Sequence, residues 1–117
     1  MQIEGAGCLL RIYVGEAKHH GTVPLYQAVV ELLRARGVAG ASVFRGIEGY
    51  GKSARIHTTQ ILRLSEDLPI LIEVIDSEER IRSVLPELDA MIGDGLITLE
   101  KVEIFAYRAT ALQDGAR

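Results

Sequence analysis

The chain has 117 residues, of which 48% are hydrophobic and 25% are charged, and its formal net charge is −3. This composition is typical of one soluble globular domain and excludes a disordered or fibrous chain. The negative net charge provides no basic field for a phosphate backbone, so we expect no nucleic-acid partner. Apolar runs such as residues 70–75 are far shorter than the ~20 residues of a membrane span, and the sequence does not start with a basic stretch followed by a long apolar one. We therefore expect a cytoplasmic protein with no direct membrane insertion.

The first part of the chain is predicted to form a strand, a helix and a second strand. Residues 8–14 alternate between two faces with the period of a strand. A helix is predicted next, with Thr22 as its N-cap, Pro24 in its first turn and Gly37 as a left-handed cap at its end. Residues 41–47 have the character of the second strand. The apolar face of the helix comprises Leu25, Ala28, Val29, Leu32 and Leu33.

After a long excursion, the second part of the chain is predicted to form a third strand, a second helix and a last strand. Residues 70–75 form a strongly β-branched third strand, and Asp76 with Glu79 makes an N-capping pattern for the helix that follows. Pro86 falls inside this helix, where a proline costs ~3 kcal/mol or introduces a kink. The last strand covers residues 96–107, with a bulge expected near Glu100 and Lys101. The apolar positions of the second helix are Ile81, Val84, Leu85, Leu88, Met91 and Ile92.

The order β-α-β-β-α-β is the split βαβ arrangement of a ferredoxin-like α+β fold, in which two helices cover one face of a four-stranded antiparallel sheet. We expect a single domain over residues 1–117, with a core at about 8–108, frayed ends at residues 1–5 and 110–117, and a long loop between the second and third strands. The other face of the sheet is predicted to mix Arg11, Glu73 and Glu103 with apolar side chains. Such a face is too apolar for water alone, so we expect it to pack in an oligomer. Its predicted apolar members are Leu9, Tyr13, Leu71, Ile75, Phe105 and Tyr107.

Residues 46–53 match the G-x-x-x-x-G-K-[ST] pattern of a phosphate loop, and residues 70–76 resemble the strand that ends in an Mg²⁺-organising aspartate. A true phosphate loop runs from a strand into a helix and belongs to a parallel sheet. The stretch after Ser53 is instead rich in residues that favour strands. A nucleotide hydrolase is therefore the less favoured alternative, and a flexible loop with glycine turns is the simpler interpretation.

Gly93, Asp94 and Gly95 lie between the second predicted helix and the last strand, and we call them the Gly-Asp-Gly turn. Backbone N–H groups with unusual φ freedom can form an anion-binding concavity at such a junction. The simpler interpretation is that Gly93 caps the helix and Gly95 turns the chain.

The histidines and the single cysteine raise the question of a metal site. His19 and His20 are adjacent and would point apart, and neither His57 nor Cys8 adds a ligand at a metal-site interval, so we predict no metal. Cys8 is expected to be a buried thiol. The sequence has no serine elbow and no carboxylate dyad, and it contains no asparagine for the chemistry of ferredoxin-like acylphosphatases. We predict a protein that is not an enzyme, with no catalytic residues.

Five motifs follow one another along the chain: residues 37–43, Gly49-Tyr50-Gly51-Lys52, His57-Thr58, the strand that ends at Asp76, and the Gly-Asp-Gly turn. In order and placement these motifs resemble those of the PII signalling proteins, and the resemblance spans about residues 8–108. In detail, the chain resembles the PII-like family called domain of unknown function 190. The matching motifs are His20-Gly21, Pro24-Leu25-Tyr26, Arg45-Gly46-Ile47, Gly49-Tyr50-Gly51, Ile56-His57-Thr58 and Leu64-Ser65-Glu66-Asp67-Leu68-Pro69.

The PII resemblance implies a homotrimer that holds a small anionic effector, such as an adenine nucleotide, in clefts between subunits. It also implies that the loop of residues 48–60 acts on a target protein, such as a membrane transporter or channel. Beyond such an effector, we expect no cofactor. The effector-binding residues that this implies are Gly49, Tyr50, Gly51, Lys52, Ser53, Arg55, Gly93, Asp94, Gly95 and Arg108.

Some positions depart from the PII pattern. Ser53 stands where PII proteins carry the glutamine that contacts the metal and the oxoacid, and Leu96 stands where a phosphate-binding lysine would follow the turn. No tyrosine occurs between Tyr50 and Tyr107, so the loop lacks the hydroxyl that is uridylylated in classical PII proteins. These departures argue against classical 2-oxoglutarate and Mg-ATP sensing. The alternative is a protein-interaction module that needs no small ligand.

Overall fold

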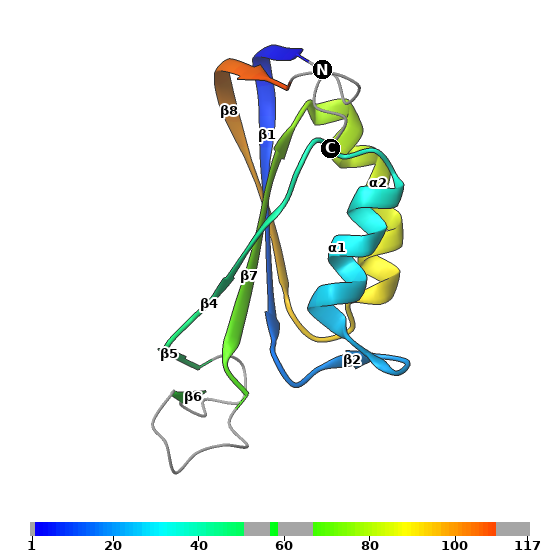
Figure 1. Cartoon of the computed structure of the whole chain (residues 1–117), viewed down its shortest axis with the longest axis vertical. Coiled ribbons are helices and arrows are strands. Elements are labelled where there is room, and N and C mark those ends of the chain that lie inside the picture. The colour runs from blue at the N-terminus through cyan, green and yellow to red at the C-terminus, as the bar shows by residue number, and fades with distance from the viewer. Residues whose placement is uncertain (1, 51–56, 59–66, 110–117) are drawn as a thin grey trace.

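The computed structural model describes residues 2–50, 57–58 and 67–109, which form a four-stranded antiparallel sheet with two helices packed on one side (Figure 1). The strand order is β4-β7-β1-β8, so the first and third long strands of the chain lie at the centre. This arrangement confirms the predicted ferredoxin-like α+β fold. The elements are β1 (Gln2–Gly15), α1 (Leu25–Ala35), β4 (Ser42–Arg45), β7 (Pro69–Asp76), α2 (Glu78–Met91) and β8 (Leu96–Arg108).

Two short pairs of strands extend this frame. β2 (His19–His20) pairs with β3 (Val23–Pro24) just before α1, and β5 (Glu48–Gly49) pairs with β6 (His57–Thr58) beyond the end of β4. Gly21 closes the first pair with φ +64°, a left-handed value that favours glycine. The second strand was predicted over residues 41–47. The structure has the shorter strand β4 there, and β5 follows it as a separate strand.

The core lies between the helices and the sheet. Alternate residues of β1, beginning at Cys8, and alternate residues of β7, beginning at Ile70, point toward the helices, as the period of two predicts. The helices contribute their predicted apolar faces, which pack at intervals of three and four residues. The buried thiol of Cys8 is confirmed. The core comprises Cys8, Leu10, Ile12, Val14, Leu25, Val29, Leu33, Ile70, Ile72, Val74, Ile81, Val84, Leu88 and Ile92.

The helix ends differ in part from the prediction. Pro24, not Thr22, is the N-cap residue of α1, and no side chain caps this end. Gly37 follows the helix with φ +80°, which confirms the predicted left-handed position. The N-cap of α2 is Ser77 rather than Asp76, and its Oγ accepts a hydrogen bond from the N–H of Arg80 at 3.2 Å. Asp76 belongs to β7, and its carboxylate is used elsewhere.

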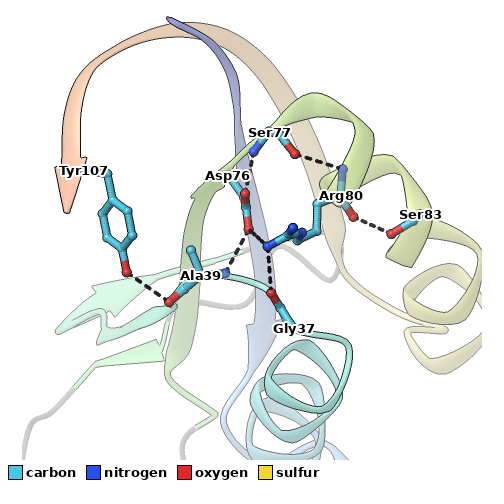
Figure 2. A network of polar contacts seen from close by, with 7 residues as sticks. All are labelled: Gly37, Ala39, Asp76, Ser77, Arg80, Ser83 and Tyr107. Carbon is cyan, nitrogen blue, oxygen red and sulfur yellow. Dashed lines mark hydrogen bonds and ion pairs between the residues drawn. The ribbon is translucent and has the colours of Figure 1, made fainter. Parts of the chain in front are cut away.

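Asp76 is a buried carboxylate, 1% exposed, that ties the end of β7 to the segment after α1 (Figure 2). One oxygen accepts the N–H of Ala39 at 2.8 Å, and the other accepts the N–H of Ser77 at 2.6 Å. Arg80 lies 3.7 Å from the first oxygen and donates to the carbonyl of Gly37 at 3.1 Å. The burial of this charge is therefore offset by backbone donors and by a neighbouring guanidinium.

α2 continues through Pro86, so this residue does not end the helix.

β1 begins at Gln2, and the prediction that residues 1–5 are frayed is wrong for the part that the structure describes. These first residues pair with the end of β8, which supplies the hydrogen bonds that a frayed end would lack. The predicted frayed end at residues 110–117 lies outside the described residues.

The irregularity of the last strand lies later than predicted. Glu100 and Lys101 pair in regular register with Leu9 and Cys8, and the register shifts only between Ile3 and Gly5 of β1. Gly5 has φ +93° at this shift, as a bulge often requires. Because the register is regular up to this point, Glu103 pairs with Ala6 and lies on the helix side, so its predicted place on the opposite face is wrong.

The opposite face of the sheet, which we call the open face, carries no helix of the described chain (Figure 1). Arg11 lies at its centre, with Nε 3.1 Å from Glu73 and Nη1 3.4 Å from Glu100, and the hydrogen bond to Glu73 raises the pKa of Arg11. Tyr13, Phe44 and Ile75 surround these charges with exposed apolar surface. The strand register assigns to this face Leu9, Arg11, Tyr13, Ser42, Phe44, Leu71, Glu73, Ile75, Leu96, Thr98, Glu100, Val102 and Ile104.

Two aromatic residues predicted for this face lie in or beyond the bulge. Phe105 has no partner in the register and is 92% exposed. Tyr107 pairs with Ile3 beyond the shift, and its hydroxyl donates to the carbonyl of Ala39 at 3.3 Å. The structure therefore does not place Phe105 and Tyr107 in the regular part of the open face.

Candidate functional site

One end of the sheet, which we call the loop end, gathers most of the described candidate residues (Figure 1). Gly15 of β1 pairs there with Pro69 of β7, and Tyr13 pairs with Leu96 of β8. Gly49 and Tyr50 follow β4 at this end, and the Gly-Asp-Gly turn precedes β8 there. The antiparallel topology thus brings the base of the long loop and the Gly-Asp-Gly turn to the same end of the molecule.

The base of the long loop is closely packed against β7. The N–H of Gly46 donates to the carbonyl of Pro69 at 2.7 Å. A Cβ atom at Gly46 would lie 2.6 Å from Cγ of Pro69, so the chains approach as closely as glycine allows. Gly49 packs against the same proline, since a Cβ there would lie 3.2 Å from its Cγ. Gly46 and Gly49 of these motifs are therefore explained by their close packing against Pro69.

The turn after β1 also holds the loop base. The carboxylate of Asp67 accepts the N–H of Ala17 at 2.5 Å and fills the space where Gly15 lacks a side chain. The N–H of Glu16 donates to the carbonyl of Leu68 at 2.8 Å, and its carboxylate pairs with Arg45 at 2.6 Å. Both chain segments that enter and leave the long loop are thus anchored to the turn after β1.

The glycines of the Gly-Asp-Gly turn were explained as a helix cap and a chain reversal, and the structure gives a different explanation. Neither Gly93 nor Gly95 is in the left-handed region, and the C-cap residue of α2 is Ile92 in an extended conformation. Gly95 is needed for close approach, because a Cβ there would lie 2.6 Å from the carbonyl oxygen of Tyr13. Gly93 has nothing within 4 Å of such an atom. The turn is therefore fixed by packing against β1 at one glycine and open at the other.

Lys18 is a residue of this end that the sequence motifs did not identify. Its Nζ lies 3.3 Å from the carboxylate of Asp94, so it places a positive charge beside the Gly-Asp-Gly turn. The strand topology could have identified Lys18. β1 and β8 are antiparallel neighbours, so the turn that follows β1 must lie beside the turn that precedes β8. Lys18 belongs to the turn after β1, whereas the phosphate-binding lysine of the PII pattern would stand at the position of Leu96.

The remaining predicted site residues do not join this group in the described chain. Arg108 pairs with Gln2 at the far end of β8, about 40 Å from the loop end at the rise of a strand. Gly51, Lys52, Ser53 and Arg55 lie outside the described residues.

The described residues provide neither a metal-binding cluster nor the setting of a phosphate loop. Within residues 2–50, 57–58 and 67–109, no group of three or more histidine, cysteine, aspartate or glutamate side chains could hold a metal ion. The described sheet is antiparallel, and the next described element after β5 is β6 rather than a helix. The match to a phosphate-loop pattern therefore lacks the parallel-sheet context that such a loop needs.

None of the described helices is long and apolar enough to cross a membrane.

Comparisons with known proteins agree with this architecture. The model of the DUF190 family (domain of unknown function 190), described as "Uncharacterized ACR", matches residues 7–104. A UPF0166 protein of Aquifex aeolicus (strain VF5) is 42% identical over 96 residues, which cover 82% of this chain and 90% of that protein. A UPF0166 protein of Methanocaldococcus jannaschii is 36% identical over 98 residues, which cover 83% of this chain and 90% of that protein.

Among solved structures, the chain is similar to CPII, a nitrogen regulatory PII-like protein from Thiomonas intermedia K12, bound to ADP, AMP and bicarbonate. The TM-score is 0.66 at 16% identity, and the similarity covers 89% of this chain and 91% of CPII. At this identity the likeness establishes the fold alone. From the family match and this fold, we conclude that the chain belongs to the DUF190 family and has a PII-like fold.

Proposed function

We propose that this protein is a non-enzymatic PII-like regulator, a homotrimer that binds a small anionic effector in clefts between subunits. The observation that carries the proposal is the PII-like fold, which is shared with a protein solved with ADP, AMP and bicarbonate. An adenine nucleotide is the effector that we test first. The loop of residues 48–60 would then act on a target protein in the cytoplasm, such as a membrane transporter or channel.

The open face supports the oligomer. Each of its four strands presents an exposed apolar side chain. Ile75 of β7, for example, is 47% exposed. Monomeric proteins seldom leave so many apolar side chains of one face in water. A second and third copy would bury it, and the Arg11–Glu73 ion pair would satisfy the charges at its centre.

The loop end supports the effector site. The base of the loop at Gly49 and Tyr50 and the Gly-Asp-Gly turn lie at one end of the sheet, and Gly51, Lys52, Ser53 and Arg55 continue the loop in the sequence. Backbone N–H groups of a turn and nearby cations are the usual partners of phosphate oxygens. Arg108 lies at the other end of the sheet within one chain, so in this proposal it would reach the site from a neighbouring subunit.

The second candidate is an interaction module that binds a target protein without a small ligand. It is favoured by Leu96, which follows the Gly-Asp-Gly turn where a phosphate-binding lysine was expected, and by Ser53 in place of the expected glutamine. A target whose capture is lost on deleting residues 53–60, and does not change with nucleotides, would favour this candidate.

Two measurements on the wild-type chain test the proposal. Size-exclusion chromatography with light scattering should give three times the chain mass of 12.8 kDa at micromolar concentration. Thermal shift with ATP, ADP, AMP, cyclic AMP and bicarbonate should show stabilisation by at least one of them, of ~2.7 kcal/mol at 100 times its Kd. Adenosine serves as the uncharged control. A monomer contradicts the assembly, and a trimer that no anion stabilises leaves the second candidate.

A further inference from the structure

We propose that Lys18 is the cation of the Gly-Asp-Gly turn, and that Asp94 is a built-in competitor whose carboxylate the anionic effector displaces. The inference rests on the proposed effector function and deepens it. Its starting point is the 3.3 Å contact between Nζ of Lys18 and the carboxylate of Asp94. This pair joins two segments that are far apart in the sequence, and it supplies the cation that Leu96 does not.

Lys18 is held in place by its own backbone. Its N–H donates to the carbonyl of Gly15 at 3.2 Å, and its carbonyl accepts the N–H of Leu25, the first residue of α1, at 2.8 Å. The turn that carries Lys18 is also fixed to the loop base through Ala17 and Asp67. The Cα of Lys18 is therefore anchored, while its side chain remains 45% exposed and available to a ligand.

On the other side of the Lys18–Asp94 contact, the Gly-Asp-Gly turn is held in place at one of its glycines. Gly95 is pressed against the carbonyl of Tyr13, whereas the position of Gly93 is open. The backbone of the turn thus stays beside the ammonium group of Lys18. A cation next to a fixed backbone segment can bind an anion with little loss of conformational entropy.

Asp94 is the anion that this cation already holds. Its side chain is 67% exposed, and its carboxylate contacts Lys18 at the place where an oxygen of a bound anion would be attracted. Exposed ion pairs of this kind contribute little to stability, so a phosphoryl group with several oxygens can replace the carboxylate easily. The carboxylate that it displaces would still repel the bound anion, which is why Asp94 should weaken binding rather than assist it.

The proposal predicts opposite effects for the two residues. Isothermal titration of the 117-residue chain with ADP and with inorganic pyrophosphate should show about a tenfold loss of affinity for Lys18→Ala, the loss expected for one charged hydrogen bond. Lys18→Arg should retain most of the affinity. Asp94→Asn should raise affinity about threefold or more once the competing charge is gone, and in the Lys18→Ala background this gain should disappear. Lys101→Ala, which removes the same charge from the middle of β8, is the matched control and should bind like wild type.

The outcomes separate the two proposals. If the wild type binds ADP or pyrophosphate and Lys18→Ala binds equally well, the role of Lys18 is wrong while the effector function stands. If Asp94→Asn weakens binding, Asp94 is a partner of the ligand and the competitor role is wrong. If the wild type binds neither probe, both this inference and the phosphate effector are overturned, whatever the mass of the assembly. The mass of each variant, measured alongside, shows whether it still assembles.

Discussion

Asp76 shows how a single buried charge can organise a junction. It joins the end of β7, the segment after α1 and the start of α2, and both of its oxygens accept backbone N–H groups (Figure 2). No buried side-chain nitrogen or oxygen of the described residues lacks a hydrogen-bond partner. A carboxylate is suited to this position because its two oxygens can accept from two donors that belong to different segments.

We predict that Asp76→Ala lowers the free energy of unfolding by about 2–4 kcal/mol, because two backbone N–H groups lose their acceptor in a buried place. Urea unfolding at a fixed subunit concentration measures this loss. Ser77→Ala, the neighbouring change that removes only the N-cap of α2, should cost about 1 kcal/mol. Equal losses for the two variants would mean that water replaces the carboxylate.

The ion pair between Arg36 and Glu87 links the end of α1 to α2. The guanidinium donates to both carboxylate oxygens, at 2.7 and 2.5 Å, and this lowers the pKa of Glu87 below its ordinary value near 4.5. A carboxyl whose pKa is lower in the folded state stabilises the protein above its ordinary pKa, and this contribution is lost as the pH falls through the folded value. The stabilisation is therefore present at neutral pH and disappears in acid.

We predict that Glu87→Gln reduces stability at pH 7 and that the difference from wild type shrinks as the pH falls below about 4.5. Urea unfolding at a series of pH values between neutral and acid checks the effect. Glu79→Gln, on the same helix and with the same change of charge, is the control and should show a weaker dependence on pH. A Glu87→Gln difference that does not change with pH would show that the ion pair is not responsible.

At the scale of elements, the start of β8 depends on a close approach between two chain segments. Gly95 lies against the carbonyl oxygen of Tyr13, and a Cβ there would also lie 3.0 Å from Cγ2 of Ile92. A backbone oxygen cannot move without shifting β1, and β1 pairs with both of its neighbours. The turn is therefore specified by sheet packing rather than by a special backbone angle.

Two alanine substitutions two positions apart test this explanation. Gly95→Ala should lower the free energy of unfolding by about 1–3 kcal/mol, because the added methyl overpacks the start of β8. Gly93→Ala meets nothing within 4 Å and should be tolerated. Thermal unfolding of both variants gives the comparison. If both destabilise equally, backbone flexibility in the turn is needed after all.

At the scale of the whole molecule, the open face is the feature that a single chain does not explain. The two helices cover one side of the sheet, and the other side combines a charged centre with apolar surroundings (Figure 1). The same side chains become a conventional interface once copies of the chain pack on them. The proposed assembly would thus add to the stability of this small fold.

We predict that Ile75→Lys, which places a charge within the open face, converts the proposed trimer into a monomer at micromolar concentration, because an unpaired ammonium would be buried in the interface. Light scattering measures the mass. Ile47→Lys makes the same change at an exposed position after β4 and should leave the assembly intact. A trimer that persists in the Ile75→Lys variant would mean that another surface joins the subunits.

The fold was largely predictable because its signals are local. The period of two in residues 8–14 and 70–75, and the helical spacing of apolar residues after Pro24 and after Asp76, each identified an element that the structure confirms. The errors fell at the junctions. Asp76 was expected to cap the helix beside it, and the bulge was placed near Glu100, because a capping pattern and an alternation of faces do not show which partner each group meets across the sheet.

The class of fold, most of the core and the family could be established from the sequence alone, because burial follows from the order and period of apolar residues, and a family is defined by motifs in register. Which distant residues meet became visible only in three dimensions. The folded chain places Lys18 beside Asp94 and Arg108 at the other end of the sheet. It also explains Gly95, because a side chain there would collide with the carbonyl oxygen of Tyr13. Such contacts depend on strand pairing and register, which are set by the packing of the whole sheet and leave no local trace in the chain.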